Sequence, residues 1–132
     1  MTVPELIDTE LRRQGVATTD LLLCAVSGGG DSAALAVALH AAGYQRLHLG
    51  WINHNLRSRG EMARDAAVVH ALGADLKAPV LDAEVPEGHI RSQARALGQS
   101  IEQVARRLRY EALRHIATRI ASGGPSCDTS GA

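Results

Sequence analysis

The chain of 132 residues is poor in large aromatic side chains: it has Tyr44, Trp51 and Tyr110, and no phenylalanine. Proteins that hold single-stranded nucleic acid stack successive bases on several exposed aromatic rings. We therefore expect no stacking platform of that kind from this chain alone.

Cysteine is equally scarce, since Cys24 and Cys127 are the only two and stand far apart in the chain. No CxxC pair is present, so a disulfide framework, an iron–sulfur cluster and a zinc site built from thiolates are all disfavoured. The histidines lack the HExxH spacing of a zinc protease, which leaves packing and surface roles for those other than His54. Because Cys24 stands inside an apolar run, we expect it to be an inert core residue.

Long apolar runs and an excess of one charge are absent as well. No stretch approaches the roughly 18 apolar residues of a membrane-spanning helix, and the N-terminus does not resemble a signal peptide. The 14 basic and 14 acidic side chains balance, which argues against a protein that binds nucleic acid through bulk charge. We expect a cytosolic protein with no membrane partner. Positive charge gathers in residues 91–132, which could contact a phosphate backbone or form a solvated face.

Hydrophobic periodicity predicts helices and strands in alternation. Helix starts are marked where Ser or Thr is followed three residues later by Glu or Gln, at Thr2, Ser58 and Ser100. We expect Gly73 to end the helix that begins after Ser58. The predicted strands cover 20–26, 47–52 and 78–81, and the predicted helices cover 2–15, 31–42, 58–73, 90–97 and 100–121.

This order predicts an α/β fold, a Rossmann-like three-layer α/β/α arrangement around a parallel sheet, with about three strands visible. The continuous apolar run at 20–26 is typical of a fully buried strand. One domain is expected over residues 1–121, followed by a disordered tail of small and polar residues over 122–132. In such folds the ligand lies at the carboxyl ends of the strands.

The strongest local feature is the sequence SGGGDS at residues 27–32, between the first predicted strand and the next helix. Glycines let the backbone approach a ligand and adopt positive φ, which we expect at Gly29. Main-chain N–H groups, two hydroxyls and a helix N-terminus would then converge on an anion such as phosphate. The loop has no lysine and is not a Walker A motif. A carboxylate among phosphate donors calls for a cation, and Mg²⁺ at Asp31 is the simple solution. The alternative is an ordinary glycine-rich turn with Asp31 as a helix cap.

These six residues resemble the SGGxDS signature of the PP-loop ATP pyrophosphatases. Members of that family cleave ATP between the α and β phosphates, and the loop holds the pyrophosphate. The resemblance implies that ATP and Mg²⁺ bind here, with Asp31 as the metal-binding and catalytic residue. The nucleotide-binding residues that it implies in this loop are Ser27, Gly28, Gly29, Gly30, Asp31 and Ser32.

Two further segments are similar to the tRNA(Ile)-lysidine synthases, a branch of the same family. Residues 51–57 (WINHNLR) resemble their NHxLR stretch, which implies contacts of Asn53, His54 and Arg57 with nucleotide or tRNA phosphate. Without the resemblance, this segment also fits a polar turn that Asn53 or Asn55 stabilises. Residues 101–110 (IEQVARRLRY) resemble the helix of that family that carries Glu, Arg and an Arg-Tyr pair.

Glu102, Arg106 and Arg109 stand at i, i+4 and i+7, on one face of the long helix. They form either a plain surface ion pair or a face that binds lysine or tRNA, with Glu102 receiving an ammonium group. We expect Tyr110, next to them in the sequence, to be a half-buried packing residue.

By this resemblance the chain is an ATP-dependent ligase of tRNA modification. It would adenylate the wobble cytidine of an isoleucine tRNA, release pyrophosphate and let free lysine displace AMP to form lysidine. The implied partners are isoleucine tRNA and free lysine, with a homodimer as an additional option. Family members continue beyond the long helix, so the resemblance implies the N-terminal part, with an open sheet edge where a fourth strand would pair. The alternatives are ATP binding without catalysis and a PP-loop enzyme with another substrate, by cytidine thiolation or amidation.

Overall fold

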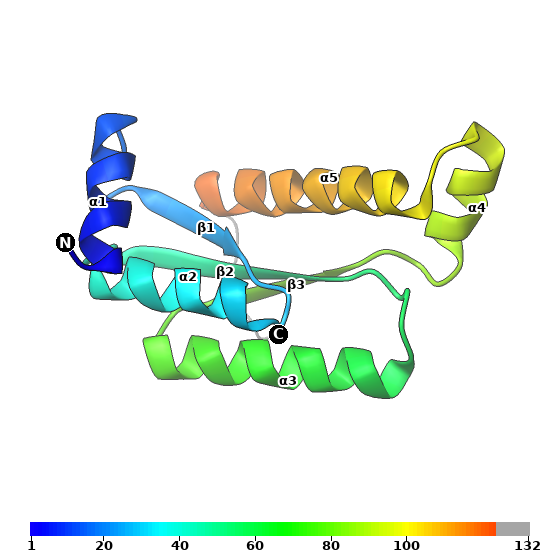
Figure 1. The fold of residues 1–132 in the computed structure, drawn as a ribbon, viewed down its shortest axis with the longest axis horizontal. Coiled ribbons are helices and arrows are strands. Elements are labelled where there is room, and N and C mark those ends of the chain that lie inside the picture. Colours follow the sequence, from blue (N-terminus) through cyan, green and yellow to red (C-terminus); the bar gives the residue numbers. More distant parts are fainter. Residues whose placement is uncertain (124–132) are drawn as a thin grey trace.

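The computed structural model of the chain describes residues 1–123. Helices and strands alternate as the periodicity predicts, and two helices follow the last strand (Figure 1). Of the predicted disordered tail over 122–132, residues 124–132 lie outside the described residues, Cys127 among them. The elements are α1 (Val3–Arg13), β1 (Leu21–Ala25), α2 (Gly30–Ala41), β2 (Arg46–Asn53), α3 (Arg59–Leu76), β3 (Val80–Glu84), α4 (His89–Leu97) and α5 (Ile101–Ala121).

Three helices begin where the sequence places a capping box. The side-chain oxygens of Thr2, Ser58 and Ser100 each accept a hydrogen bond from the backbone N–H three residues later. In each case the Glu or Gln at that position accepts a bond from the cap residue's own N–H in return. These bonds satisfy donors that the first helical turn leaves unpaired, which is why the prediction of the three starts is confirmed.

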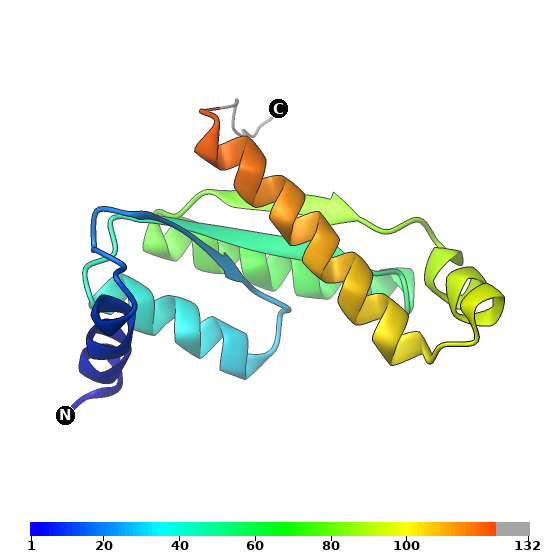
Figure 2. The same cartoon turned by 90° about the horizontal axis from the view of Figure 1, so that it is seen from above.

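The strands form one parallel sheet in the order β1-β2-β3. In the register of this sheet Cys24 pairs with Leu49, and Leu49 pairs with Val80. Helices α2 and α3 lie on one face and α5 lies on the other, where it crosses the strands diagonally (Figures 1 and 2). The predicted α/β fold with helices on both faces of a parallel sheet is confirmed.

The sheet separates two apolar cores. Because neighbouring side chains of a strand point to opposite faces, Trp51 packs toward α2 and α3, whereas Ile52 packs toward α4 and α5. Leu49 and Val69 are fully buried in the first core, and Val104 is fully buried in the second. The two cores hold the layers together and fix the ends of the strands in space.

Strand β1 is less buried than its apolar sequence predicts. Cys24 is 5% exposed, but Leu21, Leu22 and Leu23 are only half-buried. The expectation of a fully buried strand is wrong because, within residues 1–123, β1 pairs with β2 alone and forms an edge of the sheet.

Helix α3 does not end at Gly73 but continues to Leu76, where Lys77 takes the left-handed conformation. Gly73 is buried, and a Cβ atom there would collide with the Val80 side chain and lie 2.9 Å from the Ala78 carbonyl oxygen. The glycine therefore lets α3 pack closely on β3, and the prediction that it ends the helix is wrong. The described part of the chain also contains no helix with the length and apolar character needed to cross a membrane.

Candidate functional site

The two polar loops that the sequence singles out meet at one edge of the sheet. Residues 26–29 follow the carboxyl end of β1, and residues 54–58 follow the carboxyl end of the parallel neighbour β2. Ser27, Ser32 and His54 line one pocket of about 200 Å³ at this edge. The two loops therefore lie next to each other, as the sequence predicts.

The glycine loop is closed by its two serines. The Ser27 N–H donates to Ser32 Oγ at 3.0 Å, the two hydroxyl oxygens lie 3.2 Å apart, and Ser32 Oγ donates to the Gly29 carbonyl at 3.3 Å. The N–H groups of Gly28 and Gly30 donate to no acceptor among residues 1–123. Because Gly30 opens α2, these free donors lie at the positive end of a helix, where an anion is favoured.

The backbone conformation assigns the glycines different roles. Gly28 has φ +91°, whereas Gly29, the N-cap of α2, has φ −87°, so the expectation of positive φ at Gly29 is wrong. A Cβ atom on Gly28 would also lie 3.0 Å from the Cβ and Cγ atoms of Asp65. Gly28 is thus the position that needs glycine, both for its conformation and for the close approach of α3.

Asp65 packs against the glycine loop at Gly28 and pairs with Arg57, an arrangement that the sequence did not predict. The guanidinium of Arg57 contacts the Asp65 carboxylate and lies 4.0 Å from that of Glu61. The spacing of four residues from Arg57 to Glu61 and from Glu61 to Asp65 is the sequence signal for such a shared face. Arg57 therefore links the loop after β2 to α3, and Asp65 links α3 to Gly28.

The asparagines of the second loop shape the turn. Asn53 Oδ1 accepts a hydrogen bond from the Asn55 N–H at 3.0 Å, and Asn55 takes φ +56°. The Asn55 amide donates to Glu84 at 2.9 Å and to the Val85 carbonyl at 2.7 Å, which ties the loop to the end of β3. Asn53 lines a separate pocket on the α3 side and not the pocket of Ser27. This geometry matches the turn-stabilising alternative for both asparagines.

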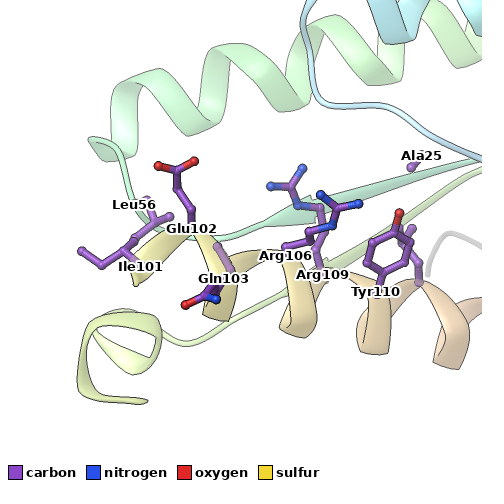
Figure 3. Close-up of a pocket in the computed structure, with 10 residues that line it drawn as sticks. Ala25, Leu56, Ile101, Glu102, Gln103, Arg106, Arg109 and Tyr110 are labelled. Atoms are coloured by element: carbon purple, nitrogen blue, oxygen red, sulfur yellow. The ribbon is translucent and has the colours of Figure 1, made fainter. Parts of the chain in front are cut away.

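A larger pocket of about 600 Å³ adjoins the first along α5. Glu102, Arg106 and Arg109 all line it, and their side chains rise from the same side of the helix (Figure 3). Ala25 and Arg109 line both pockets, so the end of β1 and one residue of α5 lie between the two spaces. The three residues that the sequence places on one helix face are thus brought together at one pocket wall.

Tyr110 belongs to the wall of this larger pocket and not to the core. Its side chain is 57% exposed, and the guanidinium carbon of Arg106 lies 5.7 Å from the centre of its ring. The expectation of a half-buried packing residue is wrong, because its position on α5 faces away from the buried residues Val104 and Ile116. Its ring provides a flat apolar surface with a cation beside it.

The His54 ring has a defined hydrogen bond at one nitrogen and a lowered pKa. Its Nδ1 accepts a hydrogen bond from the Leu56 N–H at 3.0 Å. Burial lowers the pKa of the imidazole below its usual value of 6.5, and the positive charges of Arg109 and Arg57 lower this pKa further. The ring is therefore neutral near pH 7.

Asp31 is exposed in the first turn of α2, beside the free amides. Residues 1–123 contain no cluster of three or more side chains that could hold a metal ion by themselves. Mg²⁺ in nucleotide sites is commonly bound by one or two carboxylates together with phosphate oxygens. Asp31 thus fits Mg²⁺ only when a phosphate-bearing ligand completes the coordination.

Cys24, as expected, is a buried free thiol, and its burial raises the pKa of the thiol.

The chain is similar to proteins of a known family. The family model described as the PP-loop domain matches residues 5–122. A tRNA(Ile)-lysidine synthase of Thermus thermophilus is 37% identical over 122 residues, which cover 92% of this chain and 22% of the relative. The enzyme of the same name from Treponema pallidum is 36% identical over 103 residues, covering 74% of this chain and 21% of the relative.

A solved structure of an NH3-dependent NAD synthetase from Campylobacter jejuni, in complex with the nitrate ion, has a similar fold. Its TM-score is 0.58 at 16% sequence identity, and the match covers 87% of this chain and 48% of that chain. The chain spans about a fifth of the length of the curated relatives named above. Since the PP-loop model matches almost the whole described chain, the protein belongs to the PP-loop domain family.

Proposed function

We propose that this chain is the ATP-binding part of a tRNA(Ile)-lysidine synthase, an AMP-forming ligase that joins lysine to the wobble cytidine of isoleucine tRNA. The observation that carries the proposal is the pair of free amides at Gly28 and Gly30, placed at a helix N-terminus beside the pocket of Ser27, Ser32 and His54. The similarity to proteins of that name supports the substrate class. A cytoplasmic location follows from a tRNA substrate, and a homodimer remains part of the proposal.

In this reaction the cytidine oxygen attacks the α phosphorus of ATP, and pyrophosphate leaves. The free amides of the glycine loop, the Ser27 and Ser32 hydroxyls and the N-terminus of α2 would stabilise the charge that grows on the leaving pyrophosphate. Mg²⁺ bound by Asp31 and the phosphates would neutralise part of the same charge. Asp31 is therefore the proposed catalytic and metal-binding residue, and it acts through the cation.

The two pockets suit different parts of the substrates. The pocket of about 200 Å³ beside the glycine loop suits phosphate groups, and Arg109 supplies a positive charge on its wall. The pocket of about 600 Å³ lies within the usual range for a small-molecule site, roughly 300–1,000 Å³. Glu102 would bind the ammonium group of lysine there, while Arg106 and Arg109 would bind the phosphates of ATP or tRNA.

A second candidate is an ATP-binding unit that does not complete the reaction by itself. The observation in its favour is that the chain spans about a fifth of the length of its named relatives. Both candidates require ATP binding at the glycine loop. They differ in whether the chain alone releases pyrophosphate when lysine and isoleucine tRNA are present.

Calorimetry with ATP and Mg²⁺ tests the shared requirement. We expect binding by the unchanged chain and its loss in Asp31→Ala, whereas Asp75→Ala, on the exposed face of α3, serves as the matched control and should bind normally. Equal ATP affinity of the chain and of folded Asp31→Ala would refute the site. Pyrophosphate release that depends on isoleucine tRNA, followed by AMP release that depends on lysine, would support the ligase over the binding unit.

A further inference from the structure

The hydrogen bond between Leu56 and His54 fixes where the imidazole carries its proton. A backbone N–H can only donate, so the His54 Nδ1 atom that accepts from it at 3.0 Å has no hydrogen. A neutral imidazole carries its single proton on one of its two nitrogens, which leaves Nε2 as the N–H donor. The loop after β2 thus selects one tautomer through a main-chain contact.

The groups around His54 favour the uncharged ring. Arg57 from the same loop and Arg109 from α5 are the charged groups that act on it, and both are cations. From the β1–α2 connection, Ser27 and Ser32 contribute hydroxyls to the pocket that His54 lines. Burial and the two cations lower the imidazole pKa, so a second proton does not bind near pH 7.

We propose that His54 is a neutral hydrogen-bond donor which offers Nε2–H, and neither a base nor a cation, to an anionic phosphate group bound between Ser27, Ser32 and Arg109. This role rests on the proposed function, because it assigns the phosphates of ATP to the pocket of about 200 Å³. Arg109 supplies the charge at the pocket wall, and His54 supplies a directed bond.

Nuclear magnetic resonance of the 15N-labelled chain tests the tautomer directly. Long-range proton–nitrogen correlations distinguish Nδ1–H, Nε2–H and doubly protonated rings, and the signal missing from His54→Gln assigns this residue. We expect the Nε2–H pattern at pH 7. A proton on Nδ1, or a doubly protonated ring at pH 7, would overturn the inference whether or not the chain binds ATP.

Calorimetry with pyrophosphate and Mg²⁺ then tests the donor role. The amide nitrogen of glutamine lies near the place of Nε2 and that of asparagine near the place of Nδ1, so the two substitutions separate the nitrogens. We expect His54→Gln to bind within about threefold of the unchanged chain and His54→Asn to bind at least about tenfold more weakly, as for a lost bond to a charged group. The control is His70→Asn, since His70 pairs with Asp82 of β3, does not line the pocket of Ser27 and should leave affinity unchanged.

The outcomes separate this inference from the proposed function. If the unchanged chain binds no pyrophosphate and no ATP, the proposed function fails, and the phosphate role of His54 fails with it. If it binds both but the glutamine and asparagine variants weaken binding equally, the site stands and the Nε2–H role is overturned. Thermal unfolding of each variant confirms that it is folded at the temperature of the titration.

Discussion

Replacement of Gly28 by alanine tests whether the loop needs its left-handed residue. The native φ of +91° lies where an L side chain is strained, at a cost of about 1–2 kcal/mol. The new Cβ would lie 3.0 Å from the Cβ and Cγ atoms of Asp65, and such overpacking costs about 1–3 kcal/mol. Alanine restricts the unfolded chain and returns about 0.4–1 kcal/mol. We therefore expect the free energy of unfolding to fall by about 3 kcal/mol.

Urea unfolding followed by circular dichroism measures this loss. With a dependence of about 2 kcal/mol per molar urea, the midpoint of Gly28→Ala should fall by about 1.5 M. Gly30→Ala is the matched control, because Gly30 has no positive φ and its Cβ would meet no atom within 4 Å. Its midpoint should stay equal or rise slightly, since alanine favours a helix more than glycine does. Equal midpoints for the two variants would refute both the conformational and the packing argument for Gly28.

Three other outcomes follow from the contacts described above. Gly73→Ala should lower the free energy of unfolding by about 1–3 kcal/mol, because the new methyl group collides with Val80; an unchanged urea midpoint would contradict the close packing of α3. Ser100→Ala should cost about 1 kcal/mol in the same assay, because the Gln103 N–H loses its 3.1 Å acceptor; no loss would mean that this cap contributes nothing. For His54 the folded pKa lies below the unfolded value of 6.5, so the unfolded chain binds more protons as the pH falls. The unchanged chain should therefore lose stability relative to His54→Gln between pH 7.5 and pH 5.5, and a pH-independent difference between the two would refute the lowered pKa.

The features that depend on neighbouring residues in the chain could be predicted from the sequence. The caps at Thr2, Ser58 and Ser100 need only a serine or threonine and a partner three residues later, so their positions are correct. The alternation of apolar segments likewise gives the order of the elements and the parallel sheet. For the same reason the glycine loop and the loop after β2 could be placed at one edge.

The errors arise where a distant part of the chain decides the structure. Gly73 signals a helix end by local preference, but β3 packs against it and the helix continues. The third strand begins at Val80 and not at Ala78, because the Ala78 N–H bonds back to the Gly73 carbonyl and Pro79 has no N–H to pair. Asp65 carried no motif of its own, and its place against Gly28 depends on how α3 approaches the loop.

Arg109 lines both pockets, so ligands bound in the two spaces would be coupled through this one cation. Two ligands that interact with one cation change each other's affinity, and the change must be equal in both directions. An anion bound in the smaller pocket would partly neutralise Arg109, so a second anion would bind more weakly in the larger pocket. A cation in the larger pocket would bind more strongly, because the first anion attracts it. Arg109 alone would therefore couple the two ligands. The second ligand would bind more weakly if it is an anion and more strongly if it is a cation.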